Sequence, residues 1–413
     1  MVLESRYGVA QRDSVIQIDE TGCNLDLLKG LDLSRQKTIA IFGVNGSLVK
    51  RFLASGFSDV KKIFPNVKFV GVDLHQKPLD HLKSLGLPWR DVFYFTPEEF
   101  KKNWEKVGVD GVIAAVPPND HLGIAKEWSE RGIAVWVEKP LVLPSQLKEM
   151  EALIKSNPGK IFPADFYIDS APVNFLLKNI ELLQSIGKIK RFDGRLIENI
   201  PLERGREWLM DPKISGGGLG MDILVHPLAL ADKLFDALGI VDPIQIEDVV
   251  CGTYEDLTEE LQTEEETYMY VKGRAGNVAV YIDGGKGVSQ LYYGVSLTGE
   301  YGTIDIFTGT ENCDPYINIQ NSENKIFTFP NKGVGYEGTF FDFLLLLYGS
   351  SESCYTSLPE RLKAGINSIN YMKNAYSKAK KKECVVYKLG EEPPVPVKPR
   401  GQTLPFMIEE KRT

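Results

Sequence analysis

Two short segments of this sequence carry side chains that could move protons. The first is VEKP at 137–140, in which Lys139 follows an apolar run and directly precedes a proline. The second is DILVH at 222–226, in which a carboxylate and an imidazole are four residues apart. Moving a hydride to or from a C–OH or C=O group needs a proton relay at the same oxygen and a cavity that excludes water. Lys139 and His226 are therefore candidate catalytic residues.

Each segment also has a plain structural interpretation. Lys139 can be a surface lysine in a turn before proline, and a lone histidine on a helix is more often structural than catalytic. A spacing of four would place Asp222 and His226 on one face of a helix. There His226 could exchange a proton with substrate while Asp222 binds a hydroxyl group or orients the imidazole ring. Asp222 could instead merely complement a helix dipole.

A regular alternation of strands and helices predicts how these residues are positioned. Near-continuous apolar strands separated by helices are typical of a parallel sheet that is covered on both faces. The sequence therefore predicts an α/β fold whose N-terminal part, residues 38–168, is a Rossmann domain with a doubly wound parallel sheet. Its expected strands are 38–42, 67–73, 112–116, 134–138 and 161–166, and its expected helices are 47–55, 121–131 and 145–156.

The pattern changes near Asp169, where strand candidates begin to follow one another directly. Runs of adjacent strands predict a C-terminal α+β domain, residues 169–390, with a large, mostly antiparallel sheet. Residues 1–37 are predicted to be an N-terminal extension and residues 391–413 an extended tail. The expected strands are 189–196, 247–254, 267–273, 277–283, 290–298 and 303–307, followed by a final helix at 359–380.

A glycine-containing turn after the first strand is the candidate cofactor site. Gly43, Asn45, Gly46 and Ser47 lie where the strand leads into a helix, whose N-terminal amides can hold a pyrophosphate. The dinucleotide fingerprint is only partly matched, because it needs glycine where Asn45 stands and a small residue where Leu48 stands. A simple strand-to-helix turn would explain the segment as well.

Asp73, at the end of the second strand, bears on the choice of cofactor. A carboxylate at this place can bind both ribose hydroxyls and repel a 2′-phosphate, which favours NAD(H). NADP(H) is the alternative, because His75 or Lys77 could receive a 2′-phosphate. Asp73 could also be an ordinary turn residue.

Three segments together resemble a known family. They are VPPNDH at 116–121, EKP at 138–140, and WLMDPKISGGGLGMDILVH at 208–226. In order and spacing they are similar to the Gfo/Idh/MocA family, named for glucose-fructose oxidoreductase, inositol dehydrogenase and the rhizopine catabolism protein MocA. The resemblance covers residues 38 to about 380.

The resemblance implies a Rossmann domain and a second domain with an open-faced sheet that forms homodimer or homotetramer contacts. It places the residues after the third strand beside the cofactor and allows a cis peptide at Pro140. Glu138 would support Lys139 or contact the nicotinamide. The cofactor contacts added in this way are Val116, Pro117, Asn119, His121 and Glu138.

The predicted function is an NAD(P)-dependent oxidoreductase acting on the CH–OH group of a sugar, a cyclitol or a derivative. Vicinal hydroxyls of such a small-molecule substrate suit Lys139, Asp222 and His226. The resemblance also allows an NAD-dependent glycosidase or an imine or tetrapyrrole reductase, and a catalytically silent, cofactor-sensing regulator is an alternative of another class. Further candidate substrate contacts are Asp165, Tyr167, Arg206, which could instead form a surface ion pair, and Trp208, which could instead be core.

Composition argues against several other classes. With 413 residues, 43% hydrophobic and 25% charged, the chain is expected to be folded, and its net charge of −8 gives no positive field for nucleic acid. The longest apolar stretch, 340–348, is far shorter than the roughly 20 residues that span a bilayer. Five scattered cysteines, four histidines and no secretory signal predict a reduced, cytoplasmic protein without a metal site.

Overall fold

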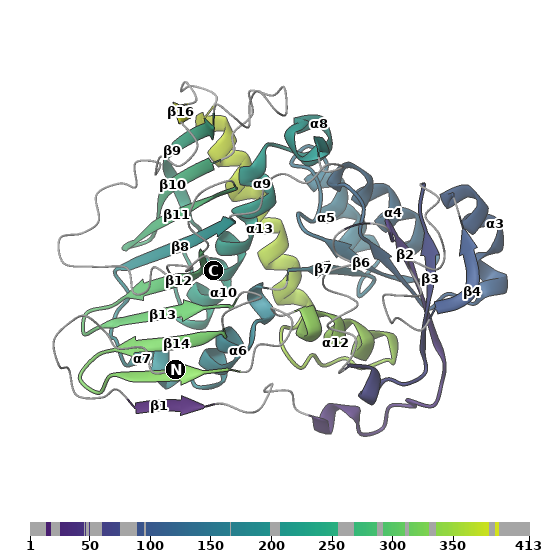
Figure 1. Ribbon diagram of the computed structural model, residues 1–413, viewed down its shortest axis with the longest axis horizontal. Coiled ribbons are helices and arrows are strands. Elements are labelled where there is room, and N and C mark those ends of the chain that lie inside the picture. The colour runs from purple at the N-terminus through teal and green to yellow at the C-terminus, as the bar shows by residue number, and fades with distance from the viewer. Residues whose placement is uncertain are drawn as a thin grey trace, which may run out of the picture.

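The computed structural model of the chain contains two β-sheets with helices packed between and around them (Figure 1). Several predicted features lie outside the described residues: Asn45, Ser47, Arg206, the expected helix at 47–55 apart from Val49, and the expected tail at 391–413. The structure describes residues 14–17, 25–44, 46, 49, 60–74, 89–94, 96–165, 167–198, 207–254, 268–286, 292–309, 314–329, 336–379 and 385–387.

The first sheet is parallel throughout and confirms the predicted doubly wound fold. Its strand order is β4-β3-β2-β5-β6-β7, so the chain reverses direction across the sheet between β2 and β5. β4 was not predicted, and the other strands lie within three residues of their expected bounds. The strands are β2 (Lys37–Phe42), β3 (Val67–Val72), β4 (Trp89–Tyr94), β5 (Gly111–Ala114), β6 (Ala134–Glu138) and β7 (Ile161–Ala164).

Alternate residues of these strands pack into two different cores, because successive side chains of a strand point to opposite faces. Ala40 and Phe42 belong to the core that includes residues of α3 (Pro97–Val107), α4 (His121–Ser129) and α5 (Leu147–Ser156). Ile39 and Ile41 belong to the core that includes α12 (Tyr336–Leu347). Both faces of the sheet are therefore covered, one of them by a helix from far along the chain.

Aromatic residues of α12 pack closely against this second face of the first sheet. The ring centroid of Phe343 lies 5.7 Å from that of Trp136 and 5.4 Å from that of Phe162. A Cβ atom on Gly111 would lie 2.9 Å from a methyl carbon of Leu347. The division between residues 168 and 169 stays a prediction, because α12 follows it in the sequence and yet completes the packing of the first sheet.

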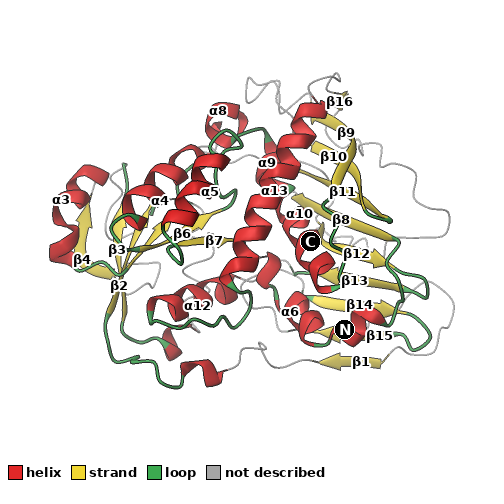
Figure 2. Cartoon of the chain, turned by 180° about the vertical axis from the view of Figure 1, so that it is seen from behind, coloured by secondary structure: helices red, strands yellow, loops and turns green. Residues whose placement is uncertain are grey.

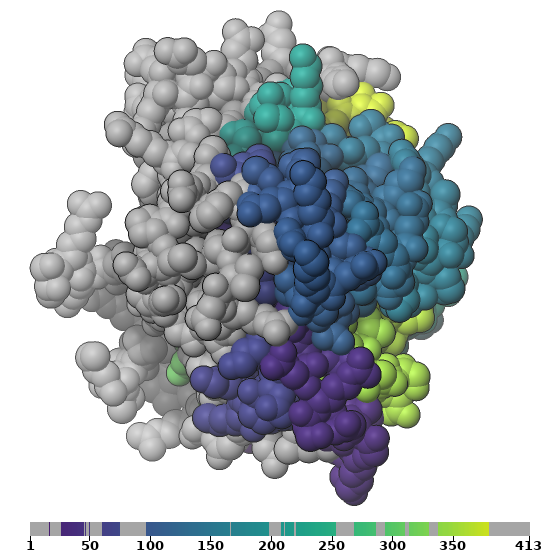
Figure 3. Space-filling view, turned by 90° about the vertical axis from the view of Figure 1, so that its right-hand side faces the viewer, coloured from purple at the N-terminus to yellow at the C-terminus, as the bar shows by residue number. Residues whose placement is uncertain are grey.

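The end of α12 also meets the segment before β2. The Tyr348 hydroxyl donates to the carbonyl oxygen of Arg35 over 3.1 Å, and the Lys37 ammonium lies 5.4 Å from the centre of the Tyr348 ring. Figure 3 shows these parts side by side, with the purple N-terminal residues next to the yellow-green ones. No single described helix, α12 included, is long and apolar enough to span a membrane.

The second sheet has the order β1-β15-β14-β13-β12-β8-β11-β10-β9-β16. It is mostly antiparallel, as predicted, with parallel pairs at β1–β15, β8–β11 and β9–β16. Strands β1, β14, β15 and β16 were not predicted. Its strands are β1 (Ser14–Gln17), β8 (Arg191–Glu198), β9 (Gln245–Tyr254), β10 (Tyr268–Ala275), β11 (Val278–Lys286), β12 (Tyr292–Thr298), β13 (Thr303–Phe307), β14 (Tyr316–Gln320), β15 (Lys325–Thr328) and β16 (Val385–Tyr387).

A layer of helices separates the two sheets (Figure 2). The long helix α13 (Leu358–Ala379), predicted within one residue of its bounds, contacts β7 of the first sheet, β9 of the second and α10 (Val225–Ala237). It therefore ties the two halves together. The remaining elements are α6 (Ala171–Lys178), α7 (Ile180–Gln184), α8 (Pro212–Ser215), α9 (Leu219–Ile223) and the short 3-10 helices η1 (Leu25–Leu28), η3 (Pro118–Asp120), η4 (Tyr167–Asp169) and η5 (Glu207–Met210).

One cysteine departs from the sequence-based expectation. Cys354 is buried and disulfide-bonded, so the prediction of reduced cysteines is wrong at this position. Cys251, on β9, is half-buried. The bond could not be expected from spacing, because a disulfide requires close Cα atoms and not a particular sequence separation.

We predict that Phe343→Ala lowers the free energy of unfolding by about 3 to 5 kcal/mol, because it leaves a cavity between Trp136 and Phe162. Chemical denaturation measures the change. Val241→Ala is the control, because Val241 is 87% exposed and its truncation should change stability by less than about 0.5 kcal/mol. Equal effects of the two variants would contradict the role given to α12.

Candidate functional site

The candidate site lies at the carboxyl ends of the first sheet, where the strand order reverses between β2 and β5. Gly43 follows β2 with a φ of +77°, and a Cβ atom there would lie 2.2 Å from the carbonyl oxygen of Ala115. Only glycine fits so close to the chain that follows β5. The Gly46 amide donates to the carbonyl oxygen of Gly43 over 2.8 Å and closes the turn. Ligands of open α/β sheets bind at such a reversal.

Other residues predicted to bind the cofactor border the same edge. Asp73, half-buried, follows β3, and Val116 and Pro117 follow β5. Asn119 is half-buried in η3, and its carbonyl oxygen accepts from the Gln146 side chain over 3.1 Å. Its side-chain oxygen is buried without a hydrogen-bond partner among the described residues. This unpaired acceptor can take a donor from a ligand.

His121 was predicted to contact the cofactor, but its side chain is packed inside the protein. Its ring is fully buried, with Nδ1 2.9 Å from the carbonyl oxygen of Pro140 and Nε2 2.9 Å from that of Val116. Burial lowers the pKa of His121. The ring therefore joins the loop after β5 to the loop after β6, and it has no exposed atom with which to contact a cofactor.

Lys139 reaches from the first sheet to the helix layer. It follows β6 directly, and the Lys139–Pro140 peptide is cis, as the resemblance allowed. The ammonium donates to the backbone carbonyl and to the carboxylate of Asp222, each over 2.7 Å. Its side chain is 17% exposed, so the ion pair is largely shielded from solvent. Lys139 is thus held at a fixed place, unlike a surface lysine in a turn.

The prediction that Asp222 and His226 share one face of a single helix is wrong. Asp222 is in α9, which ends at Ile223, and His226 is in α10, which begins at Val225. Pro227 explains the break, because its ring would clash with the carbonyl group of Ile223 in a continuous helix. Proline is tolerated in the first turn of a new helix, where its missing N–H is not needed.

His226 is held by a carboxylate from another strand end. Its Nδ1 atom lies 2.9 Å from Oδ1 of Asp165, which follows β7 directly. The ring of Tyr167 packs against the imidazole, with centroids 4.6 Å apart. Sequence reasoning named Asp165 and Tyr167 as substrate contacts and missed this pair. The signal for it was the place of Asp165 at the same sheet edge as Lys139.

Burial and the charges of neighbouring residues shift the pKa of His226. Burial lowers the pKa of His226, Asp165 opposes this shift, and the Lys139 ammonium adds to it. His226 is only 3% exposed, so its neutral form is favoured. Lys139, Asp165, Asp222 and His226 therefore form one electrostatic unit with a single ammonium and two carboxylates.

Glu138 is the third acid beside Lys139. Burial raises its pKa to about 8; the Lys139 ammonium opposes the rise, while Asp165 and Asp222 add to it. Its Oε2 atom is buried without a hydrogen-bond partner among the described residues. A protonated Glu138 can donate one hydrogen bond and accept another at this edge.

A buried charge cluster lies behind Asp165. The fully buried guanidinium of Arg361, on α13, donates to Asp169 at the end of η4 and to Asp342 on α12. Asp169 also accepts from the hydroxyls of Thr339 and Thr356. These contacts fix η4, the segment that carries Tyr167, against two helices.

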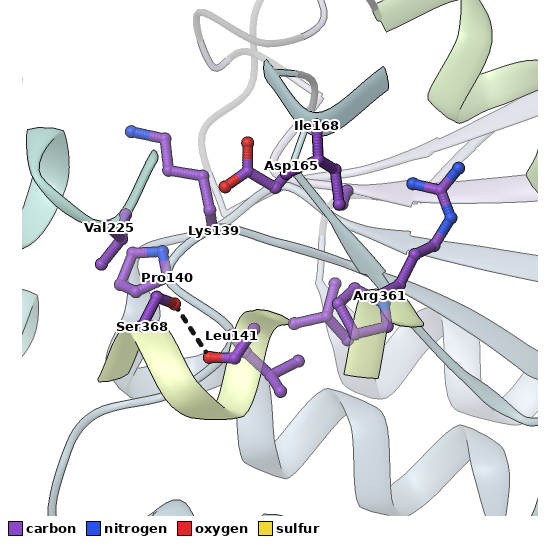
Figure 4. Close-up of a pocket in the computed structure, with 12 residues that line it drawn as sticks. Lys139, Pro140, Leu141, Asp165, Ile168, Val225, Arg361 and Ser368 are labelled. Atoms are coloured by element: carbon purple, nitrogen blue, oxygen red, sulfur yellow. Dashed lines mark hydrogen bonds between the residues drawn. The ribbon is translucent and has the colours of Figure 1, made fainter. Parts of the chain in front are cut away.

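A small cavity of about 20 Å³ separates the Lys139–Pro140 loop from α13. Figure 4 shows Lys139 and Asp165 on one side of the Pro140–Leu141 segment and Ser368 on the other. The volume suffices for about one water molecule, so this cavity does not hold a substrate.

Trp208, the remaining predicted substrate contact, is half-buried in η5, which packs against α9. Its role toward a substrate stays a prediction. Within the described ranges, no three His, Cys, Asp or Glu side chains are arranged to hold a metal ion.

The fold thus combines a glycine turn at the reversal of a doubly wound sheet with Lys139 at the end of β6 and with His226, on α10, held by Asp165 at the end of β7. Solved structures share it. The chain superposes on the aldose-aldose oxidoreductase from Caulobacter crescentus, complexed with glycerol, with a TM-score of 0.66 and 16% identity, over 84% of this chain and 98% of that one.

Two further structures are similar over most of their length. KijD10, a 3-ketoreductase from Actinomadura kijaniata in complex with NADP and TDP-benzene, gives a TM-score of 0.65 at 13% identity, over 86% of this chain and 100% of that one. Levoglucosan dehydrogenase, in complex with NADH and levoglucosan, gives 0.64 at 17% identity, over 84% and 98%. These neighbours are oxidoreductases of the Gfo/Idh/MocA type, so the predicted resemblance is confirmed for the fold. No protein-family model and no curated protein matches the sequence.

We predict that Glu138→Gln removes a pH dependence of stability. The side chain releases its proton near pH 4.5 when unfolded and near pH 8 when folded, so the folded protein binds more protons between these values. The free energy of unfolding should therefore fall as the pH rises through this window, by at most about 1.4 kcal/mol per pH unit. Glutamine cannot ionise and should flatten the fall.

Denaturation at several pH values between about 5 and about 8 measures this difference. Glu149→Gln is the matched control, because Glu149 lies exposed on α5 and its substitution should leave the pH dependence as in the unaltered protein. The same pH dependence in the unaltered protein and in Glu138→Gln would show that Glu138 ionises normally.

Proposed function

We propose that this protein is an NAD(P)-dependent oxidoreductase that transfers a hydride between nicotinamide and a C–OH or C=O group of a sugar, a cyclitol or a derivative. The observation that carries the proposal is the pairing of Lys139 with Asp222 and of His226 with Asp165 at the edge that also carries the Gly43 turn. The fold shared with sugar oxidoreductases supports it.

The residues at this edge suit a dinucleotide. The close approach at Gly43 leaves backbone rather than side chain facing a pyrophosphate, and Asp73 follows β3 where a ribose would lie. The unpaired oxygens of Asn119 and Glu138 offer an acceptor and a carboxyl group to polar atoms of the cofactor. When bound, the nicotinamide accepts or donates the hydride. We expect NAD(H) to be preferred over NADP(H) because of Asp73.

Lys139 would hold the reacting oxygen of the substrate. An ammonium has three N–H donors, and two of those of Lys139 are directed at the carbonyl and carboxylate oxygens of Asp222. The third can donate to a substrate oxygen. Because Asp222 holds the ammonium from one side, the direction of this third donor is set by the protein and not by the substrate.

His226 would accept the proton that leaves the hydroxyl group during oxidation. The Asp165 carboxylate can only accept a hydrogen bond, so Nδ1 of His226 carries a proton and Nε2 carries the lone pair. Burial keeps the ring neutral and ready to take a proton. In the reverse direction, the protonated ring would return the proton to the developing alkoxide.

The charges favour an uncharged substrate. With Glu138 protonated and His226 neutral, the single ammonium of Lys139 faces the two carboxylates of Asp165 and Asp222. A further anion would meet a net negative group, whereas hydroxyls can donate to these carboxylates. A neutral polyol is the substrate class that fits this balance.

We predict that Lys139→Ala lowers kcat at least about 100-fold while NAD(H) still binds, because the lysine contacts the reacting oxygen and not the pyrophosphate. Nicotinamide absorbance during incubation with a panel of sugars and cyclitols measures turnover, and fluorescence titration with NADH and NADPH measures binding. Lys148→Ala, an exposed lysine on α5, should be as active as the unaltered protein.

The alternatives give different results in the same assays. A regulator would bind cofactor without turning over any compound, and Lys139→Ala would then change nothing. A glycosidase would cleave glycosides without net accumulation of NADH. Turnover of imines or linear tetrapyrroles, with none of sugars and cyclitols, would overturn the substrate class and keep the fold assignment.

We predict that Asp165→Asn lowers kcat roughly 10- to 100-fold with a smaller effect on KM. An amide NH₂ can donate to Nδ1 of His226, which would move the ring proton to Nε2 and remove the proton acceptor. Asp193→Asn is the control, because Asp193 pairs with Arg191 on the second sheet, away from this edge. An unchanged kcat in Asp165→Asn would show that Asp165 does not set the tautomer.

The predicted homodimer or homotetramer through the second sheet stays a proposal, as does the cytoplasmic location. Helices α6, α9, α10 and α13 contact this sheet (Figure 2). Polar side chains also pair on this sheet: Arg191 pairs with Asp193 along β8, and Arg195 on β8 pairs with Asp283 on β11. Native mass spectrometry reports both the oligomeric state and any cofactor that copurifies.

A further inference from the structure

Tyr376, near the end of α13, contacts the beginning of α9. Its hydroxyl oxygen lies 3.0 Å from the amide nitrogen of Gly218 and 3.0 Å from that of Met221, and it accepts a hydrogen bond from each. The residues are more than 150 positions apart in the sequence. The contact therefore joins the long central helix to the short helix that carries Asp222.

The Tyr376 hydroxyl replaces the N-cap side chain that α9 lacks. Gly218 is the N-cap of α9 and has no side chain, so it cannot accept from the first amides of the helix. In most helices a Ser, Thr, Asp or Asn at the N-cap accepts from the second or third residue, and Met221 is the third residue here. Tyr376 supplies this acceptor from a different helix.

The glycines before α9 are explained by the same contact. A Cβ atom on Gly217 would lie 2.4 Å from the ring of Tyr376, so the ring can reach the helix only over a glycine. Gly216 has a φ of +86°, which favours glycine on its own. Close approach of a ligand is therefore not needed to explain Gly217.

The other end of α9 presents Asp222 to Lys139. Both the backbone carbonyl and the carboxylate of Asp222 accept from the ammonium. A helix of five residues is only about 7 Å long, so a shift of its first turn also moves its last turn. On the sheet side α9 fits closely, because a Cβ atom on Gly284 of β11 would lie 2.7 Å from the Ile223 side chain. Tyr376 therefore fixes the end that the sheet does not.

We propose that Tyr376 is a positioning residue whose hydroxyl holds α9 so that Asp222 keeps both of its acceptors on Lys139. The inference rests on the proposed function, since it is the proton-handling role of Lys139 that gives this position its importance. Tyr376 would act through α9 and not by a contact of its own with the substrate.

The test is Tyr376→Phe, which removes the hydroxyl and keeps the ring that packs on Gly217. Amide hydrogen exchange at Gly218 should become faster by at least about tenfold, because its bond to the Tyr376 hydroxyl is lost. Exchange at Met221 should also become faster, but less so, because this amide also donates to the Gly218 carbonyl oxygen over 3.2 Å. With a substrate found in the panel, kcat should fall roughly tenfold while KM changes less than about twofold. This is the result expected when a reacting group is misplaced and the groups that bind the substrate are unaltered.

A double variant separates positioning from general destabilisation. In an Asp222→Asn background, in which Lys139 has lost the carboxylate and keeps the backbone carbonyl, Tyr376→Phe should lower kcat by clearly less than the tenfold expected alone, since the two residues act in part through the same contact. Tyr371→Phe is the matched control on the same helix. Its hydroxyl donates to Asp232, so its loss should lower stability and leave kcat unchanged.

The outcomes are distinct. Unchanged amide hydrogen exchange at Gly218 and Met221 in Tyr376→Phe overturns the proposed capping role, whether or not kcat changes. Faster exchange with unchanged kcat in an active enzyme, or additive losses in the double variant, overturns the positioning role. If the unaltered protein turns over no compound and exchange still becomes faster, the cap stands and the proposed function fails.

Discussion

The buried guanidinium of Arg361 is the interaction on which the arrangement around the site depends. It joins α13 to Asp169 at the end of η4 and to Asp342 on α12, and its Nε donates to the backbone carbonyl of Thr356. Asp342 in turn accepts from the backbone amides of 354–356. Removing one partner of such a buried pair costs about 3 to 5 kcal/mol, because a charge is left unpaired in a poorly polarisable medium. The cluster therefore holds three segments in one geometry.

Short segments of the chain connect this buried cluster to His226 and Asp165. Asp165, which orients His226, is four residues before Asp169, and Tyr167 lies between them with its ring against the imidazole. Lys233, seven residues after His226 on α10, donates to the carbonyl oxygen of Ile168 over 2.7 Å. Both the histidine and its carboxylate are thus tied to the same buried cluster. Such support is what keeps a proton acceptor within hydrogen-bond reach of its partner.

The sequence predicted the parts of the fold that depend on local pattern. Apolar strands, the turn at Gly43 and the strand-end position of Lys139 follow from residue type and spacing, and all are found. The contacts of the site depend on residues far apart in the chain and could not be expected. His226 pairs with a residue 61 positions away, and Lys139 with one 83 positions away. Pro227 did signal the helix break, but the motif spacing was read as one helix.

The two edge strands of the second sheet, β1 and β16, are short, and they are the first and the last strands along the described part of the chain. β1, of four residues, pairs with β15, and β16, of three residues, pairs with β9. An uncovered edge exposes unpaired N–H and C=O groups that can pair with another molecule. β9 is ten residues long and would offer a long template. The short strands β1 and β16 therefore leave little backbone for another molecule to pair with, and they belong to a different sheet from the strand ends that carry Lys139 and Asp165.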